Sequence, residues 1–257
     1  DIHTLPIEVL DMITAMDVEE YLSYLESYTK DGKLYTNREE GKARKLSSLK
    51  SFYDYYFKKN LIRTNPPRQV DVPKIKNKNI IRLDPNEIAQ LLDEAESGEK
   101  LSGRQLASHE KTKVRDVAIL TLLLGTGIRV SECVGLNLED VDFNNGAIRI
   151  IRKGGNEALI YFGDEVSQAL EAYMNGPRKK DEPAAGHEEA LFISLNKTRI
   201  TTRSVERLVK KYSRLVTTVK KITPHKLRST FGTALYQETG DIYLVADTLG
   251  HKDVNTT

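Results

Sequence analysis

An apolar run from Val117 to Leu124 predicts a buried helix. The motif that follows is Gly125-Thr-Gly-Ile-Arg129-Val-Ser-Glu132, whose two glycines are expected to break this helix before a new one opens with Arg129 in its first turn. A charged side chain therefore follows directly on a core element. Arg129 is either a structural ion-pair partner of Glu132 or an anion clamp whose five donors face a cleft.

Length and cysteine content limit the class of protein. A chain of 257 residues can form one large or two modest domains, each with its own core. Its apolar runs are too short to cross a bilayer, and no signal-peptide pattern opens the sequence, so we expect neither a membrane nor a secreted protein but a cytoplasmic one. The single cysteine, Cys133, excludes an internal disulfide framework and a multi-cysteine metal site, and is expected to be a small core residue.

The net charge of +2 hides a strong segregation of charge along the chain. Residues 1–26 hold seven acidic residues and no lysine or arginine, whereas residues 197–228 hold eleven basic residues against the single acid Glu206. A solvated helix face could carry such a run. The excess of ten positive charges in 32 residues favours instead a polyanionic partner, most plausibly nucleic acid.

The first part of the chain, residues 1–66, predicts a small all-helical domain. A helix is expected from Asp17, as its N-cap, to Leu25, followed by a polar loop over 29–36. In a second helix the residues Leu46, Leu49, Phe52, Tyr53, Tyr56 and Phe57 form an aromatic stripe, read as core rather than as a base-stacking platform. Its basic flank is expected to contact phosphates through Lys42, Arg44 and Lys45.

Residues 67–83 have the composition of an interdomain linker, with prolines, no periodicity and a basic excess. Its lysines Lys74, Lys76 and Lys78 would lie along a nucleic-acid backbone, although a merely soluble tether explains them equally well. Asp84-Pro85-Asn86-Glu87 then predicts an N-cap, a proline at the first helical position and an acid three residues after the cap. This is where the second domain, residues 84–257, is expected to begin.

Within the second domain the pattern switches to strands and back to helices. Segments 146–153 and 158–162 flank Gly154-Gly155-Asn156, which predicts a β-hairpin with Lys153 beside the turn. Helices are expected over 164–174 and 202–220. The basic residues expected to contact phosphates here are Arg199, Arg203, Arg207 and Lys210.

Two further motifs carry chemistry. In Thr223-Pro224-His225-Lys226-Leu227-Arg228, Thr223 predicts an N-cap and Pro224 the first helical position, so His225 and Arg228 share one face of the first turn. A helix N-terminus favours anions, which Arg228 could bind with its planar fork while His225 exchanges a proton near neutral pH. In Leu249-Gly250-His251 the glycine ends an apolar helix over 242–249 and presents His251 just beyond it.

These motifs resemble, in order and rough spacing, those of the tyrosine recombinase family of phage and transposon integrases and Xer-like enzymes. The resemblance covers residues 84–257, and the first domain more weakly resembles the family's helical core-binding domain. It implies a mainly α fold with a small β-sheet and hairpin, and two domains that form a C-shaped clamp around double-stranded DNA. It also implies a homotetramer on two paired DNA sites, in the cytoplasm and associated with the nucleoid, with no membrane partner.

The resemblance assigns a role to each matched residue. Arg129 and Arg228 would bind the non-bridging oxygens of the scissile phosphate, Lys153 would protonate the leaving 5′ oxygen, His225 would assist proton transfer, and His251 would hydrogen-bond the phosphate. Glu132 would orient the first arginine or the histidine. The reaction implied is attack by a tyrosine to give a 3′-phosphotyrosyl link, with no metal and no cofactor.

The sequence departs from the family in one respect, since no tyrosine follows His251. The expectation is therefore that this chain binds DNA without cleaving it. Either a tail that carries the nucleophile is missing from the chain, or the protein is a catalytically silent DNA-binding module with an architectural or regulatory role. A type IB topoisomerase would share the chemistry, but the compact first domain and the Leu-Gly-His turn favour a recombinase.

Overall fold

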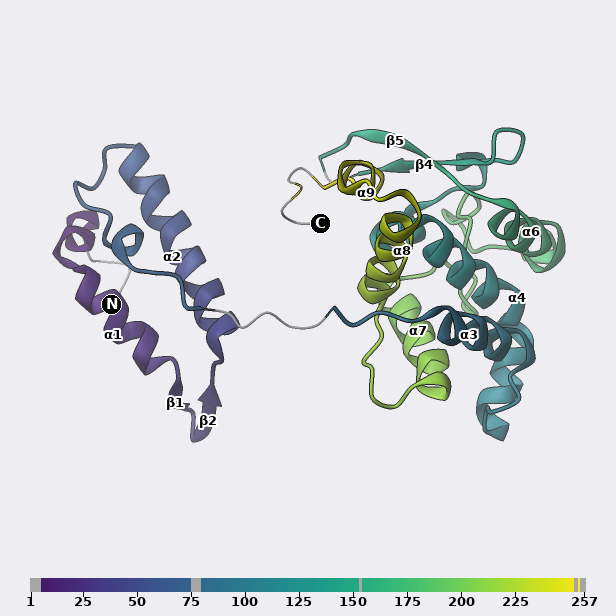
Figure 1. Cartoon of the computed structure of the whole chain (residues 1–257), viewed down its shortest axis with the longest axis horizontal. Helices are drawn as coiled ribbons and strands as arrows, with labels where there is room; N and C mark the ends of the chain where they lie inside the picture. The colour runs from purple at the N-terminus through teal and green to yellow at the C-terminus, as the bar shows by residue number, and fades with distance from the viewer. Residues whose placement is uncertain (1–5, 75–79, 153, 252–253, 255–257) are drawn as a thin grey trace. The chain divides into compact units, whose positions relative to one another are not determined.

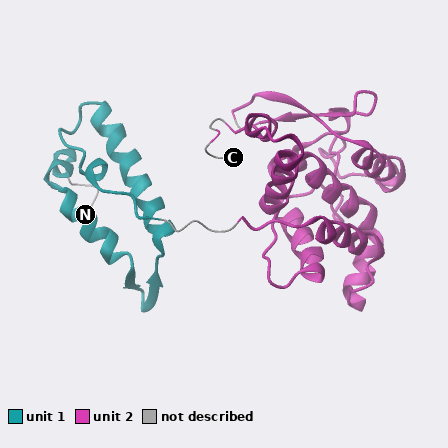
Figure 2. Cartoon of the chain, in the orientation of Figure 1, with its two compact units in different colours: residues 1–79 teal, residues 80–257 magenta. Residues whose placement is uncertain are grey.

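The computed structural model describes residues 6–74, 80–152, 154–251 and 254. The chain divides into two compact units, residues 1–79 and residues 80–257, shown in different colours in Figure 2. The division falls inside the segment 67–83 for which the composition predicts a linker. Each unit has its own hydrophobic core.

The first unit is built on two helices and a short hairpin (Figure 1). Its elements in order are η2 (Ile7–Met12), α1 (Ala15–Tyr24), β1 (Ser27–Lys30), β2 (Lys33–Thr36), α2 (Glu39–Lys58) and η3 (Pro66–Gln69). The core joins α1, α2 and the segment after η3 through Val18, Leu22, Leu25, Leu46 and Val70. A small set of aliphatic side chains therefore holds this unit together.

Two local predictions for this unit are wrong, and a third is only partly correct. Asp17 is not the N-cap of α1, because Thr14 holds that position. Asp17 lies at the third helical position, where its carboxylate accepts from the backbone N–H of Thr14 and its own N–H donates to the Thr14 hydroxyl, a capping box. Residues 29–36 are not a loop, since β1 pairs antiparallel with β2 around Asp31 and Gly32, both of which take positive φ. The aromatic stripe of α2 is only partly core, with Tyr53 buried while Phe52 and Phe57 are exposed.

The second unit is mainly helical with a three-stranded sheet at one edge (Figure 1). Its helices are α3 (Pro85–Ser97), α4 (Gly103–Thr126), α5 (Val130–Gly135), η4 (Leu138–Asp140), α6 (Asp164–Tyr173), η5 (Met174–Arg178), α7 (Thr202–Val216), α8 (Pro224–Thr239) and α9 (Ile242–Leu249). Its strands are β3 (Val141–Asp142), β4 (Ala147–Ile151) and β5 (Glu157–Tyr161), in the order β3-β4-β5 and antiparallel throughout. The predicted fold class, mainly α with a small sheet, is confirmed.

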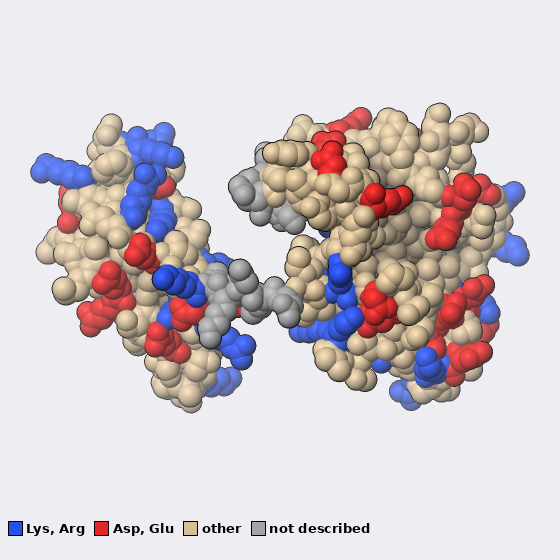
Figure 3. All heavy atoms as spheres, in the orientation of Figure 1, with Lys and Arg blue, Asp and Glu red and all other residues tan. Residues whose placement is uncertain are grey.

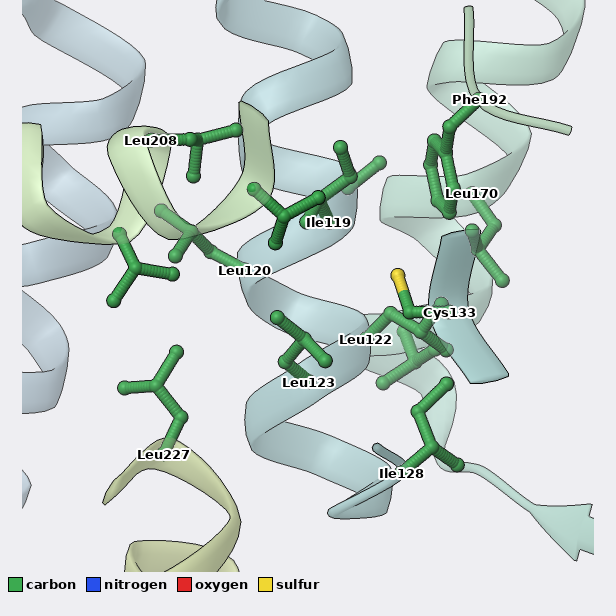
Figure 4. Close-up of a cluster of buried hydrophobic side chains, with 14 of the residues drawn as sticks. Ile119, Leu120, Leu122, Leu123, Ile128, Cys133, Leu170, Phe192, Leu208 and Leu227 are labelled. Carbon is green, nitrogen blue, oxygen red and sulfur yellow. The ribbon is translucent and has the colours of Figure 1, made fainter. Parts of the chain in front are cut away.

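Helix α4 is the central element of this unit, and α3, α6 and α8 pack around it. Figure 4 shows how the side chains of Ile119, Leu120, Leu122 and Leu123 meet residues of the surrounding elements. The apolar run thus forms the buried helix that its sequence predicts. Cys133 lies in the same core, where burial raises the pKa of its thiol to about 12.

The C-terminal end of α4 is determined by one glycine rather than by two. Gly125 lies inside the helix, whereas Gly127 follows it with a φ of 61°, a left-handed conformation that side chains disfavour. A Cβ atom added at Gly127 would come 2.3 Å from a ring carbon of Phe231. Both the backbone turn and the close approach of Phe231 therefore require glycine, and the turn places Arg129 at the N-cap of α5.

Other boundaries shift slightly from the predictions. Asp84 and Glu87 form the predicted capping box of α3, with Pro85 at the first helical position. Helix α7 ends at Val216 instead of Lys220, because Thr217 takes extended backbone angles and Lys220 turns back to donate to Glu87 at 2.5 Å. In the described ranges, no helix has the length and apolar character needed to cross a membrane.

Candidate functional site

Arg129 lies between two partners at the start of α5. Its Nη1 donates to Glu132 Oε1 at 2.8 Å, and its Nη2 donates to the carbonyl oxygen of Gly250 at 3.2 Å. The backbone N–H of Arg129 also donates to Glu132 Oε2 at 2.6 Å. The side chain of Arg129 is 35% exposed and that of Glu132 only 3%, so a buried carboxylate holds an arginine that still reaches solvent. The ion-pair interpretation of Arg129 is therefore correct, and donors remain available for an anion.

Arg228 is carried by the first turns of α8, which begins with Pro224 as predicted. Thr223 holds the N-cap position, but its side chain makes no capping hydrogen bond. The guanidinium of Arg228 is buried and donates through Nη1 to the carbonyl oxygen of Gly127 at 2.5 Å and through Nη2 to that of Leu249. Burial, together with the positive charge of Arg129, lowers the pKa of Arg228 to about 10.

The end of α9 is the point where these arginines meet. Gly250 has a φ of 62°, and the backbone N–H of His251 donates to the carbonyl oxygen of Ala246 at 2.8 Å, which closes the helix as a Schellman-type cap. Arg228 donates to Leu249 and Arg129 donates to Gly250, so two guanidinium groups bind successive carbonyl groups just before His251. The structure thus brings Arg129, Arg228 and His251 together from α5, α8 and the end of α9.

The two histidines share an environment that disfavours their protonated form. Partial burial lowers the pKa of His225, and the charges of Lys226 and Arg228 lower it further. Burial also lowers the pKa of His251, with contributions from Arg228, Arg129 and His225. Both effects favour the neutral form of each imidazole.

A third arginine at this site, Arg152, was not identified from the sequence. It follows β4 and donates through Nη2 to the carbonyl oxygen of Thr248 at 3.0 Å, with longer contacts of 3.4 Å to that of Asp247. The hairpin pattern predicts the strand but does not indicate which helix end an arginine beside the turn will contact. The neighbouring Lys153, predicted as a general acid, lies outside the described residues.

The basic residues predicted to contact phosphates differ in their availability. Lys42 is buried and pairs with Glu26 at 2.6 Å and Glu39 at 2.8 Å. Arg199 donates to the carbonyl oxygens of Val134 and Leu136 and to the side chain of Asn137. Both side chains thus have partners within the protein, and their contact with DNA phosphates stays a prediction. The exposed members are Lys74, Arg44, Arg203, Arg207 and Lys210, while Lys45 is half-buried and lies over the ring of Tyr28.

The charged surface alone does not delimit a nucleic-acid interface. Figure 3 shows Lys and Arg side chains on both units, interspersed with Asp and Glu on the face in view. Lys76 and Lys78 lie outside the described residues. In the ranges that are described, no group of three or more His, Cys, Asp or Glu side chains could hold a metal ion. The site is therefore best defined by its arginines and histidines.

Residues 81–257 match the sequence profile of the phage integrase family. The chain belongs to this family of tyrosine recombinases. This family member is 37% identical over 217 residues to tyrosine recombinase XerC of Thermodesulfovibrio yellowstonii, an alignment that covers 84% of this chain and 68% of the relative. Tyrosine recombinase XerD of Oceanobacillus iheyensis is 29% identical over 258 residues, which cover 94% of this chain and 83% of the relative.

Solved structures show the same fold. The Tn1549 transposon integrase in complex with circular intermediate DNA superposes with a TM-score of 0.71 and 24% identity, covering 98% of this chain and 81% of the integrase chain. A λ integrase dimer bound to a core site superposes with a TM-score of 0.65 and 18% identity, covering 96% of this chain and 82% of that chain. The family resemblance drawn from the sequence motifs is confirmed by the sequence profile and the XerC relative, and these structures agree with it in fold.

Proposed function

We propose that this member of the tyrosine recombinase family performs site-specific recombination of double-stranded DNA through a 3′-phosphotyrosyl intermediate. The observation that carries the proposal is the convergence of Arg129 and Arg228 at the end of α9, immediately before His251. The positive charge of Arg129 lowers the pKa of Arg228, and a bound phosphate would offset that repulsion. A phosphodiester is the anion that double-stranded DNA offers at such a site.

The proposed chemistry assigns one task to each group. Arg129 and Arg228 bind the non-bridging oxygens of the scissile phosphate and stabilise the charge of the pentacoordinate transition state, an effect worth on the order of a hundredfold or more in rate for each donor. The neutral His225 assists proton transfer, and His251 hydrogen-bonds a phosphate oxygen. Lys153 protonates the leaving 5′ oxygen. Glu132 orients Arg129 through the two hydrogen bonds described above. This set requires no metal and no cofactor.

The nucleophile is proposed to come from outside the 257 residues, because none of the 12 tyrosines follows His251. Tyr236 lies in α8 and Tyr243 in α9, both on the N-terminal side of the Leu249–His251 turn. Residues 1–257 would then bind DNA and activate the phosphate without cleaving it. Assembly as a tetramer on two paired sites, with both units of each chain on the DNA duplex, is part of the same proposal, as is a place on nucleoid DNA in the cytoplasm.

The test uses nicked DNA duplexes that carry a recombination site and trap a covalent intermediate. The product of the complete reading frame is expected to form a 3′-phosphotyrosyl adduct, and the 257-residue chain is expected to bind the same DNA without forming one. An adduct formed by the 257-residue chain would place the nucleophile among its own tyrosines. Binding without any adduct from the complete product would favour the alternative, a silent DNA-binding module.

A further inference from the structure

Four successive carbonyl groups at the C-terminal end of α9 bind three arginines that come from three other elements. Arg152 donates to Asp247 and Thr248, Arg228 to Leu249, and Arg129 to Gly250. The last carbonyl groups of a helix have no partner within the helix and form its partially negative end. The proposed function employs Arg228 and Arg129, and leaves Arg152 without a role.

Arg152 is fixed at both of its ends. Its backbone N–H donates to the carbonyl oxygen of Asn156 at 2.8 Å, and its own carbonyl oxygen accepts from Gly155 at 3.0 Å, which anchors the residue in the β4–β5 hairpin. Its guanidinium lies against the end of α9, with Nη2 closest to Thr248 at 3.0 Å. Arg152 therefore connects the edge of the sheet to a helix that is distant in the sequence.

Gly250 makes room for this contact. A Cβ atom added at Gly250 would come 2.3 Å from Nη1 and 2.5 Å from Cζ of Arg152. The same glycine has the left-handed φ of 62° needed for the turn to His251. The guanidinium of Arg152 therefore packs directly against the residue that makes the turn to His251, which links the position of Arg152 to that of the turn.

The placement of Arg152 also adds positive charge to the site. Its charge acts on Arg228 and His251, where it adds to the effects that disfavour their protonated forms. Its Nε is buried without a hydrogen-bond partner among the described residues. Three arginines and an unpaired buried donor at one point form a cationic group of the kind that a site for phosphate requires.

We propose that Arg152 is a positioning residue for the phosphate site. It ties the end of β4 to the C-terminal end of α9, and thereby fixes the Leu249–His251 turn relative to Arg129 and Arg228. The inference rests on the proposed function, since what Arg152 positions is the group of residues assigned there to the scissile phosphate. It does not require Arg152 to contact the DNA.

The first experiment measures positioning without any DNA chemistry. Hydrogen exchange is followed in the 257-residue chain for the amides of Gly250 and His251, which donate to Asp247 and Ala246 at 2.8 Å. Arg152→Ala is expected to accelerate their exchange. Arg149→Ala is the matched control, because Arg149 lies on β4, just before Arg152, and pairs with exposed or half-buried acids of other segments. Equal exchange in wild type and Arg152→Ala would overturn the proposal.

The second experiment separates positioning from DNA binding in the product of the complete reading frame. Arg152→Ala is expected to lower the strand-cleavage rate at saturating DNA roughly 10- to 100-fold, the loss typical of a misplaced catalytic group, with the affinity for DNA and its salt dependence unchanged. Arg152→Lys should recover part of the rate. A loss of affinity with a smaller salt slope would instead make Arg152 a direct phosphate ligand and overturn the proposal.

A double-mutant cycle with Gly250 supplies a further check. Gly250→Ala is expected to slow cleavage by displacing the guanidinium, so Arg152→Ala should have a much smaller effect in that background than alone. Fully additive effects would contradict the connection between the two residues.

If the wild-type protein binds DNA but never cleaves it, the proposed function fails. Hydrogen exchange would still decide whether Arg152 holds the end of α9.

Discussion

Glu132 holds Arg129 through both of its carboxylate oxygens, one bound to the guanidinium at 2.8 Å and the other to the backbone N–H at 2.6 Å. Because the carboxylate is almost fully buried, this arginine is oriented before any DNA arrives. The two roles considered for Arg129 are therefore compatible: the ion pair is what prepares the side chain to bind an anion.

The substitution Glu132→Gln should weaken both hydrogen bonds from Arg129 to residue 132. The neutral amide has only one acceptor oxygen, and its NH2 group would face one of the two N–H donors of Arg129. We expect the second unit to lose about 1.5–3 kcal/mol of unfolding free energy in urea, the range for hydrogen bonds to buried charged groups. Glu139→Gln is the control, since Glu139 is 68% exposed in its ion pair with Arg149 and should change stability by less than about 1 kcal/mol. Equal unfolding curves for both variants would mean that Glu132 does not orient Arg129.

The histidines give the protein a specific pH dependence. Burial and the neighbouring positive charges lower the pKa of His225 and His251 below 6.5 in the folded state. As the pH falls through 6.5 the unfolded chain binds these protons first, so the folded state should lose stability there and stop losing it below the folded pKa values. Well above pH 6.5 both histidines are neutral in either state and contribute no slope.

Nuclear magnetic resonance titration of the imidazole protons measures these values directly, with His225→Gln and His251→Gln to assign the signals. Addition of duplex DNA should raise the pKa of His251, because a bound phosphate favours the protonated imidazole. A pKa for His251 above 6.5 in the free protein would contradict the burial and charge described here.

The exposed basic face of α7 should contribute to DNA affinity through binding of phosphates. Replacement of Arg203, Arg207 and Lys210 by alanine is expected to reduce the slope of log affinity against log salt by roughly 0.9 for each phosphate that these side chains neutralise. The exposed residues Lys100, Lys179 and Lys180 provide a control triple variant of equal charge. Arg199→Ala should leave the slope unchanged and lower stability, since its guanidinium binds Val134, Leu136 and Asn137. An identical slope in the α7 and control variants would remove α7 from the DNA interface.

The role proposed for Lys153 can be tested by changing the leaving group. Lys153→Ala should slow cleavage of an ordinary phosphodiester by at least about a hundredfold, the contribution of a general acid. A DNA substrate with sulfur in place of the bridging 5′ oxygen leaves as a thiolate and needs no proton, so the rate should be restored on that substrate. Arg228→Ala is the control, because the loss of charge stabilisation should persist with sulfur. A Lys153→Ala defect that also persists with sulfur would exclude the acid role.

The sequence predicted those features that depend on neighbours in the chain. Capping of α3 by Asp84 and Glu87, the helix break at Gly127 and the shared face of His225 and Arg228 all follow from local spacing and backbone preference. Arg129 could be ranked as a candidate for the same reason, although its contact with Gly250 could not be inferred.

Features that depend on distant partners were missed or misjudged. The sequence around Lys42 predicts a solvated helix face. In the structure Lys42 is buried, and its ammonium group donates to Glu26, which lies 16 residues earlier. The same holds for Arg199, because the acceptors of its guanidinium lie more than 60 residues earlier in the sequence. Arg152 has its partners on α9, some 95 residues later, and no periodicity in the hairpin signals that contact. Tertiary packing, rather than local propensity, determines which basic side chains remain free.

The separate cores of the two units affect how the stability of this protein should be measured. Residues 6–74 pack around one small aliphatic cluster and the second unit around a larger one, with no side chain common to both clusters. A chain of this kind has no single melting temperature, because each core can lose its structure in a transition of its own. The chain contains no tryptophan and has tyrosines in both units, so intrinsic fluorescence will superimpose the two transitions. Calorimetry resolved into two midpoints is needed before a change in either can be assigned to a residue.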